Sequence, residues 1–142
     1  MSTIYPRLET LKKALEETVA PVREKTVKEL DTVSIGPGEV AEFAVESAKK
    51  YSAMVVTVKA TYDPSATAGI RVRWLYSADG TDYDSPEDAI DAGNYEDLTF
   101  EAGKTRQRTV LIPLLQPYVK VQIVNMDTSY SVVVTVWRTL MR

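Results

Sequence analysis

The sequence contains neither cysteine nor histidine. Without cysteine the chain can form no disulfide bridge, no zinc–thiolate site and no thiol nucleophile. Without histidine it lacks the usual general base at neutral pH and the commonest metal ligand. These two absences exclude Ser-His-Asp and Cys-His catalytic sites and histidine-based metal sites. We therefore expect a protein that is not an enzyme and that holds no metal or other cofactor.

Long apolar runs are missing as well. No stretch approaches the roughly 20 apolar residues of a membrane-spanning helix, and the first residues lack the apolar core of a signal peptide. The net charge of −3 does not favour nucleic acid as a partner. We expect a soluble protein with neither a membrane nor a nucleic acid as partner. The sequence does not define where the protein is located, and a virion is one option.

The chain has 142 residues, of which 44% are hydrophobic, so it can bury a core of its own as a single domain. From residue 31 onward, short runs of alternating apolar and polar residues are separated by turns. This alternation is typical of half-buried β-strands. It predicts an all-β fold, an antiparallel β-sandwich of the jelly-roll type, over residues 31–142. The predicted strands are 32–35, 40–45, 51–62, 70–76, 95–100, 105–112, 118–125 and 130–140, with one helical turn at 86–90.

The alternation also assigns each strand residue to the core or to the outside, because successive side chains in a strand point to opposite faces. In strand 70–76 it places Arg71, Arg73 and Leu75 outside. In strand 130–140 the inward residues are Val132, Val134 and Val136. The most regular strands predict a core built on four inward side chains, namely Val58, Val72, Trp74 and Val121.

Residues 1–30 read as a separate N-terminal segment. Pro6 suits the start of a helix over residues 6–19, and Pro21 ends it. For residues 22–30 the sequence does not distinguish a helix from an extended chain. The helix would carry one apolar stripe, at the three- and four-residue spacing of a helix face: Leu8, Leu11, Leu15 and Val19.

Isolated helices of this length are marginal in water, so the stripe needs a partner surface. We expect it to mediate self-association and the protein to be a homo-oligomer. The alternative is that the helix folds back over its own sandwich.

Residues 79–97 contain eight acidic residues and no basic one. Tyr83 and Tyr95 flank this acidic segment and, with Asp82 and Asp84, form a candidate surface for a protein or glycan partner. Two alternatives remain for the acids. Asp79, Asp82 and Asp84 could share a calcium ion, although their spacing is not that of an EF-hand and Asp-Gly is a common turn. Two acids could also serve glycoside hydrolysis, although nothing marks a buried pair.

Four arginines alternate on two predicted strands: Arg71, Arg73, Arg106 and Arg108. If these strands are neighbours, the arginines form a basic stripe that could meet phosphate or an acidic partner. Otherwise they are ordinary solvent-facing side chains.

The stretch Val72-Arg73-Trp74-Leu75-Tyr76-Ser77-Ala78-Asp79-Gly80-Thr81 resembles small β-sandwich modules of phage virion and tail-accessory proteins. The segment Arg106–Tyr118 and the closing Trp137-Arg138 pair add to this resemblance, which covers residues 31–142. The resemblance implies a structural or adhesive role in an oligomer, and it carries over no functional residue. Our hypothesis is a non-catalytic structural or assembly module that self-associates. The alternative is a carbohydrate-binding β-sandwich module.

Overall fold

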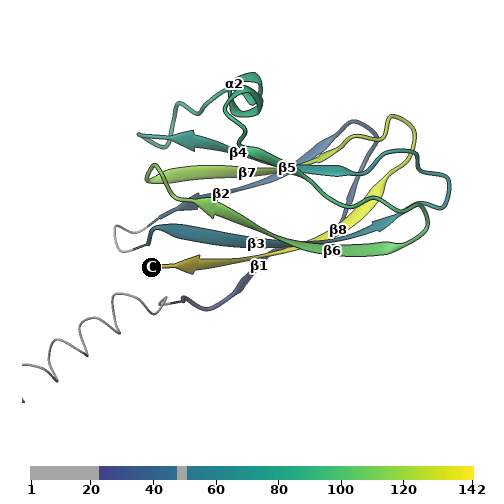
Figure 1. The fold of residues 1–142 in the computed structure, drawn as a ribbon, viewed down its shortest axis with the longest axis horizontal. Coiled ribbons are helices and arrows are strands. Elements are labelled where there is room, and N and C mark those ends of the chain that lie inside the picture. Colours follow the sequence, from purple (N-terminus) through teal and green to yellow (C-terminus); the bar gives the residue numbers. More distant parts are fainter. Residues whose placement is uncertain (1–22, 48–50) are drawn as a thin grey trace, which may run out of the picture.

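The computed structural model describes residues 23–47 and 51–142. In this part of the chain, strands form two four-stranded antiparallel sheets that pack face to face (Figure 1). Sheet A has the order β1-β8-β3-β6, and sheet B has the order β2-β7-β4-β5. The predicted antiparallel sandwich is confirmed. The strands are β1 (Val27–Ile35), β2 (Val40–Glu46), β3 (Ala53–Tyr62), β4 (Ile70–Ser77), β5 (Tyr95–Asp97), β6 (Thr105–Pro113), β7 (Tyr118–Asn125) and β8 (Val132–Met141).

The strand order is that of an eight-stranded jelly roll. Consecutive strands cross from one sheet to the other, except for β4 and β5, which are neighbours in sheet B. The first described strand, β1, therefore pairs with the last, β8. This topology brings residues from both ends of the chain onto the outer face of sheet A.

Alternating residues of both sheets fill the space between them. In β3 every second residue from Met54 to Tyr62 is buried, and in β7 so are Val119, Val121 and Ile123. The four predicted core residues are all buried, and so are the three inward valines of β8. The predicted phase of these strands is confirmed.

The start of β1 differs from the prediction. The strand begins at Val27 rather than Thr32, and a bridge between Arg23 and Met141 continues the contact with β8 further upstream. Residues 27–30 thus belong to the sandwich and not to a separate N-terminal segment. Their charged residues obscure the alternation, because β1 is an edge strand with one paired side and two register shifts. The predicted helix at 6–19 lies outside the described residues.

Leu75 is buried, although the alternation of β4 placed it on the outer face. The reason is α2 (Pro86–Asp91), a short helix that packs against β4 and lies over that end of sheet B in Figure 1. Ser85 caps this helix by accepting a hydrogen bond from the Asp88 backbone N–H (3.1 Å). The helical turn at 86–90 is confirmed, whereas β5 ends at Asp97, well before the predicted residue 100.

Two buried polar side chains join the loops at one end of the sandwich. The Asn125 amide donates to the carbonyls of Ile35, Gly36 and Tyr130 at 2.9–3.1 Å. The Asp127 carboxylate accepts from four backbone N–H groups, those of Thr67, Ala68, Ser129 and Tyr130, at 2.7–3.1 Å. The pair, here named the loop hub, fixes the β1–β2, β3–β4 and β7–β8 connections to one another.

We expect the stability of the protein to depend on pH through Asp127. Hydrogen bonds from the backbone N–H groups of Thr67, Ser129 and Tyr130 lower the pKa of this carboxyl from 3.8 to about 2. Because the folded pKa lies below the ordinary value, the stabilisation is complete above about pH 4–5 and is lost as the pH falls through about 2. In urea melts, Asp127→Asn should lower the midpoint at pH 7, and the gap to the parent should narrow toward pH 2.

The matched control is Asp91→Asn, which changes the same charge at an exposed position on α2. A gap between Asp127→Asn and the parent that stays constant from pH 7 to pH 2 would contradict this account.

Candidate functional site

The acidic segment does not assemble into one ligand platform. Tyr83 pairs with Ser77 and Tyr95 pairs with Arg73, four residues apart on β4, which is about 13 Å along a strand. A cationic side chain also lies over each ring. The Lys120 ammonium lies 4.3 Å from the Tyr83 centroid, and the Arg71 guanidinium lies 4.5 Å from that of Tyr95. The two tyrosines therefore offer separate and partly covered rings.

Several acids of this segment are engaged in holding the loop. The Asp79 carboxylate accepts from the backbone N–H of Asp82, the backbone N–H of Thr81 and the Ser77 hydroxyl, and these bonds lower its pKa. The backbone N–H of Asp84 donates to the Tyr76 carbonyl, and the Tyr76 N–H donates to the Asp84 carboxylate. The side chain of Asp82 is exposed. Across residues 23–47 and 51–142, no group of three acidic, histidine or cysteine side chains is placed to hold a metal ion.

The four arginines do not form a stripe, because β4 lies in sheet B and β6 in sheet A. Arg71 forms a bidentate pair with Asp97 (2.6 and 3.1 Å), which raises the pKa of the guanidinium. Arg73 donates to Gln122 (2.5 Å), and partial burial lowers its pKa. On the other sheet, Arg106 pairs with Glu101 (3.2 Å), and Arg108 pairs with Glu96 of β5. The last pair bridges the edges of the two sheets.

The outer faces of the two sheets differ in chemistry. The outer face of sheet B is charged and hydrogen-bonded across its strands, as in the series Glu42–Gln122–Arg73. On sheet A, the outward positions of β3, β6 and β8 include no acid and one base, Lys59. Threonine hydroxyls pair across these strands, Thr57 with Thr109 (2.8 Å) and Thr61 with Thr105 (2.9 Å). The strands β3, β6 and β8 therefore present a nearly uncharged surface, whereas the edge strand β1 adds the exposed pair Lys28–Asp31 (3.8 Å).

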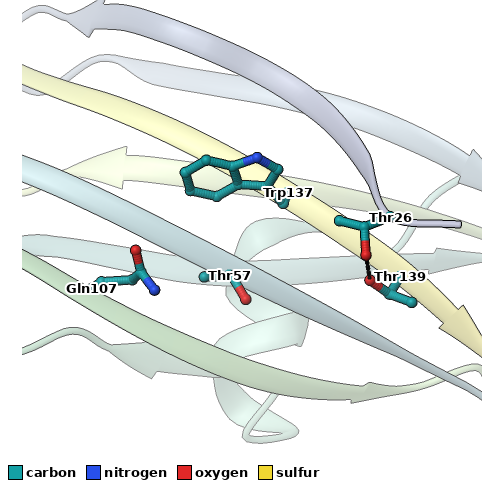
Figure 2. A pocket seen from close by; sticks show the side chains of 5 residues that line it. All are labelled: Thr26, Thr57, Gln107, Trp137 and Thr139. Carbon is teal, nitrogen blue, oxygen red and sulfur yellow. Dashed lines mark hydrogen bonds between the residues drawn. The ribbon is translucent and has the colours of Figure 1, made fainter.

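A shallow groove of about 270 Å³ lies on this face, with the half-buried indole of Trp137 in its wall. Figure 2 shows the five lining side chains, which come from distant parts of the sequence. Thr26 and Thr139 hydrogen-bond to each other (2.7 Å) on one side of the groove. Thr57 of β3 and Gln107 of β6 lie on the other side. All five lining residues are uncharged.

This groove was not predicted from the sequence. One signal was available: Val132, Val134 and Val136 point inward, so the next odd-numbered residue, Trp137, must point outward. A large aromatic side chain on the outer face of a strand is unusual enough to mark a candidate contact. The other lining residues cannot be found this way, because only the jelly-roll pairing brings β1, β8, β3 and β6 side by side.

One end of sheet A carries exposed apolar side chains. Its last row of paired residues runs from Arg23 through Met141 and Ala53 to Pro113. Beside this row Leu111 is 61% exposed, and Leu115, just beyond β6, is 70% exposed. We call Leu111, Leu115 and the adjoining Val55, Ala53 and Met141 the apolar end. The predicted stripe residues Leu8, Leu11, Leu15 and Val19 lie outside the described residues, which begin at Arg23.

Within the part of the chain that the structure describes, no helix has the length and hydrophobicity needed to cross a membrane.

No protein-family model and no curated protein matches this sequence. Solved structures do share the fold. The PBSX exported protein XepA is 10% identical with a TM-score of 0.51, over 82% of this chain and 36% of its own. The VP2 subviral particle of infectious bursal disease virus is 12% identical with a TM-score of 0.52, over 87% and 33%.

A Podospora anserina GH26-CBM35 β-(1,4)-mannanase is 12% identical with a TM-score of 0.50, over 84% of this chain and 27% of its own. The chain thus spans about a third of the length of these proteins. At these identities the likeness concerns the fold alone, and that fold is the β-sandwich on which the sequence-based resemblance rested.

Proposed function

We propose that this protein is a non-catalytic structural module that self-associates, and that it serves in a virion-type assembly. A fold shared with an exported protein and with a subviral-particle protein supports this reading at the level of architecture. The observation that carries the proposal is the apolar end of sheet A. Leu111 and Leu115 are exposed there, at the same end of the sheet as Arg23, the first described residue.

The occupant that we propose for the apolar end is the N-terminal segment of a second copy. Residues 1–22 precede Arg23, which pairs with Met141 in the last row of the sheet. The exposed leucines lie toward the opposite edge of that row, three strand spacings or about 14 Å away. A segment that extends from one copy to the next would bury the stripe and the leucines together, in a head-to-tail contact.

The alternative occupant is the same segment folded back across its own sheet. A 14-residue helix is about 21 Å long, so it could span the distance. The mass of the protein in solution separates the two arrangements.

We expect Leu11→Glu combined with Leu15→Glu to reduce the mass of the assembly measured by light scattering at tens of micromolar. Leu111→Glu alone should have the same effect, because it places a charge in the other half of the contact. The matched control is Val40→Glu, at a 40% exposed position on the outer face of sheet B, which should leave the mass unchanged. Unfolding curves should show all variants folded.

A monomeric parent protein at that concentration would overturn the proposal and favour the fold-back arrangement. A deletion used in place of the substitutions should end at residue 22, because a cut after residue 30 would remove the first part of β1.

Carbohydrate binding is the second candidate function, and one observation favours it, namely the Trp137 groove. A similar fold occurs in the GH26-CBM35 mannanase, which supports the architecture of such a module and no particular residue. The surface that the sequence predicts for a partner consists of Tyr83, Tyr95, Asp82 and Asp84. Its two tyrosines are separated along β4, and a cationic side chain partly covers each ring. We therefore place the candidate site on sheet A instead.

A further inference from the structure

We infer that the Trp137 groove binds one or two rings of a neutral glycan chain. The inference deepens the second candidate function, and it does not depend on self-association. It starts from the chemistry of the lining, which consists of one indole, three hydroxyls and one carboxamide. Binding sites for small ligands combine an apolar wall with a few placed polar groups, and this groove has both.

The indole supplies the apolar wall. Trp137 is half-buried, and its strand β8 is paired on both sides, with β1 and with β3. The Lys28 ammonium of β1 lies 5.8 Å from the ring centroid, whereas the groove extends toward β3 and β6. The C–H-rich face of a pyranose ring is flat and apolar, so it can stack on such a ring and displace water from it.

The polar groups fit the hydroxyls of a sugar. The Thr26–Thr139 pair shares one hydrogen bond, and Thr57 shares one with Thr109, so each hydroxyl keeps further bonding capacity toward the groove. Gln107 adds a carboxamide that both donates and accepts (Figure 2). Donors and acceptors thus flank the indole on two sides. There they can bond to the hydroxyls along the edge of a sugar ring that stacks on the indole.

The absence of charge among the lining residues selects for a neutral glycan. A charged sugar would find no partner among the five lining side chains. Two lysines lie beside them: Lys28, which pairs with Asp31 (3.8 Å), lies over the indole, and Lys59 lies opposite Gln107. The groove is also shallow and slightly below the roughly 300–1,000 Å³ of typical ligand pockets. It can contact one or two rings of a longer chain, so we expect weak binding, with a Kd on the order of 1 mM per site.

The experiment uses the full chain and soluble oligosaccharides of mannose, glucose, xylose and N-acetylglucosamine as probes. The chain has two tryptophans, and each has one indole N–H signal in a nitrogen–proton NMR spectrum. At least one probe should shift the Trp137 signal with saturation, while the signal of the buried Trp74 stays in place. Trp137→Ala should weaken binding at least tenfold, Trp137→Tyr should retain most of it, and Gln107→Ala should weaken it several-fold.

The matched control is Tyr95→Ala, which removes an aromatic side chain from sheet B and should leave the affinity unchanged. If no probe moves the Trp137 signal, both the groove and the carbohydrate-binding function fail. If a probe binds equally well to Trp137→Ala, the function stands and the groove assignment fails. Binding only to acidic polysaccharides, abolished by salt, would overturn the inference of a neutral ligand.

Discussion

We expect Trp74→Ala to lower the free energy of unfolding by about 3–5 kcal/mol. The side chain is 6% exposed, and it lies on the inward phase of β4 between the fully buried Val72 and the buried Tyr76. Removing the indole leaves a cavity that the neighbouring strands cannot close, because β4 is hydrogen-bonded on both sides, to β5 and β7. Urea melts at neutral pH measure the loss.

Two substitutions serve as controls for Trp74→Ala. Trp137→Ala deletes the same side chain from the outer face of sheet A, and because that side chain is only half-buried it should cost clearly less than Trp74→Ala. Trp74→Phe keeps most of the buried volume, so it should cost clearly less than the alanine variant. If Trp74→Ala and Trp137→Ala cost the same, the packing described for β4 is wrong.

The pattern of the sequence predicts most of the core, and the reason is local. Alternation over eight to ten residues identifies β3, β7 and β8 and the side that each residue takes, because the period of a strand is two wherever one face is buried. The same rule fails at Leu75, which a helix 11 residues further along the chain covers from outside. It also fails at β1, where charges on an edge strand interrupt the alternation.

Surfaces are predicted less well, because they depend on which strands become neighbours. The acidic segment was conspicuous in the sequence, yet four of its eight carboxylates, those of Asp79, Asp84, Glu96 and Asp97, bond to nearby backbone or to arginines. The Trp137 groove was inconspicuous, since it joins Thr26 to Gln107 through two intervening strands. The groove and the arginine pairs of Glu96 and Asp97 do not follow from residue spacing, because they depend on which strands become neighbours in the jelly roll.

The loop hub illustrates the same limit. From the sequence, residues 126–129 are only the connection between two predicted strands, and Asp127 does accept the local N–H groups of Ser129 and Tyr130. Its second oxygen, however, accepts from Thr67 and Ala68 in the β3–β4 connection. The side chains that form the hub therefore make a local turn and also fix a distant loop.

We expect Asn125→Ala to destabilise the protein by about 2–4 kcal/mol. The residue is 1% exposed, and its amide nitrogen is the donor to the carbonyls of Ile35, Gly36 and Tyr130. Its side-chain oxygen accepts from the backbone N–H of Asp127 (3.0 Å). Alanine would leave buried carbonyls and an N–H without their partner, and a buried polar group that loses its hydrogen bond costs about 1–3 kcal/mol.

The variant Asn125→Asp gives a stricter test. It keeps the oxygen that accepts from the Asp127 backbone N–H, and it replaces the amide nitrogen, which is the donor, by a second carboxylate oxygen. At neutral pH that oxygen would face three carbonyl oxygens, so we expect a loss at least as large as for alanine. Protonation of the new carboxyl restores one donor, and the loss should therefore shrink in acid. The matched control is Asn94→Ala, which preserves the main-chain bonds that Asn94 makes with Ala89 and Trp74. Losses below about 1 kcal/mol for both Asn125 variants in urea melts would show that the loops are held together without the hub.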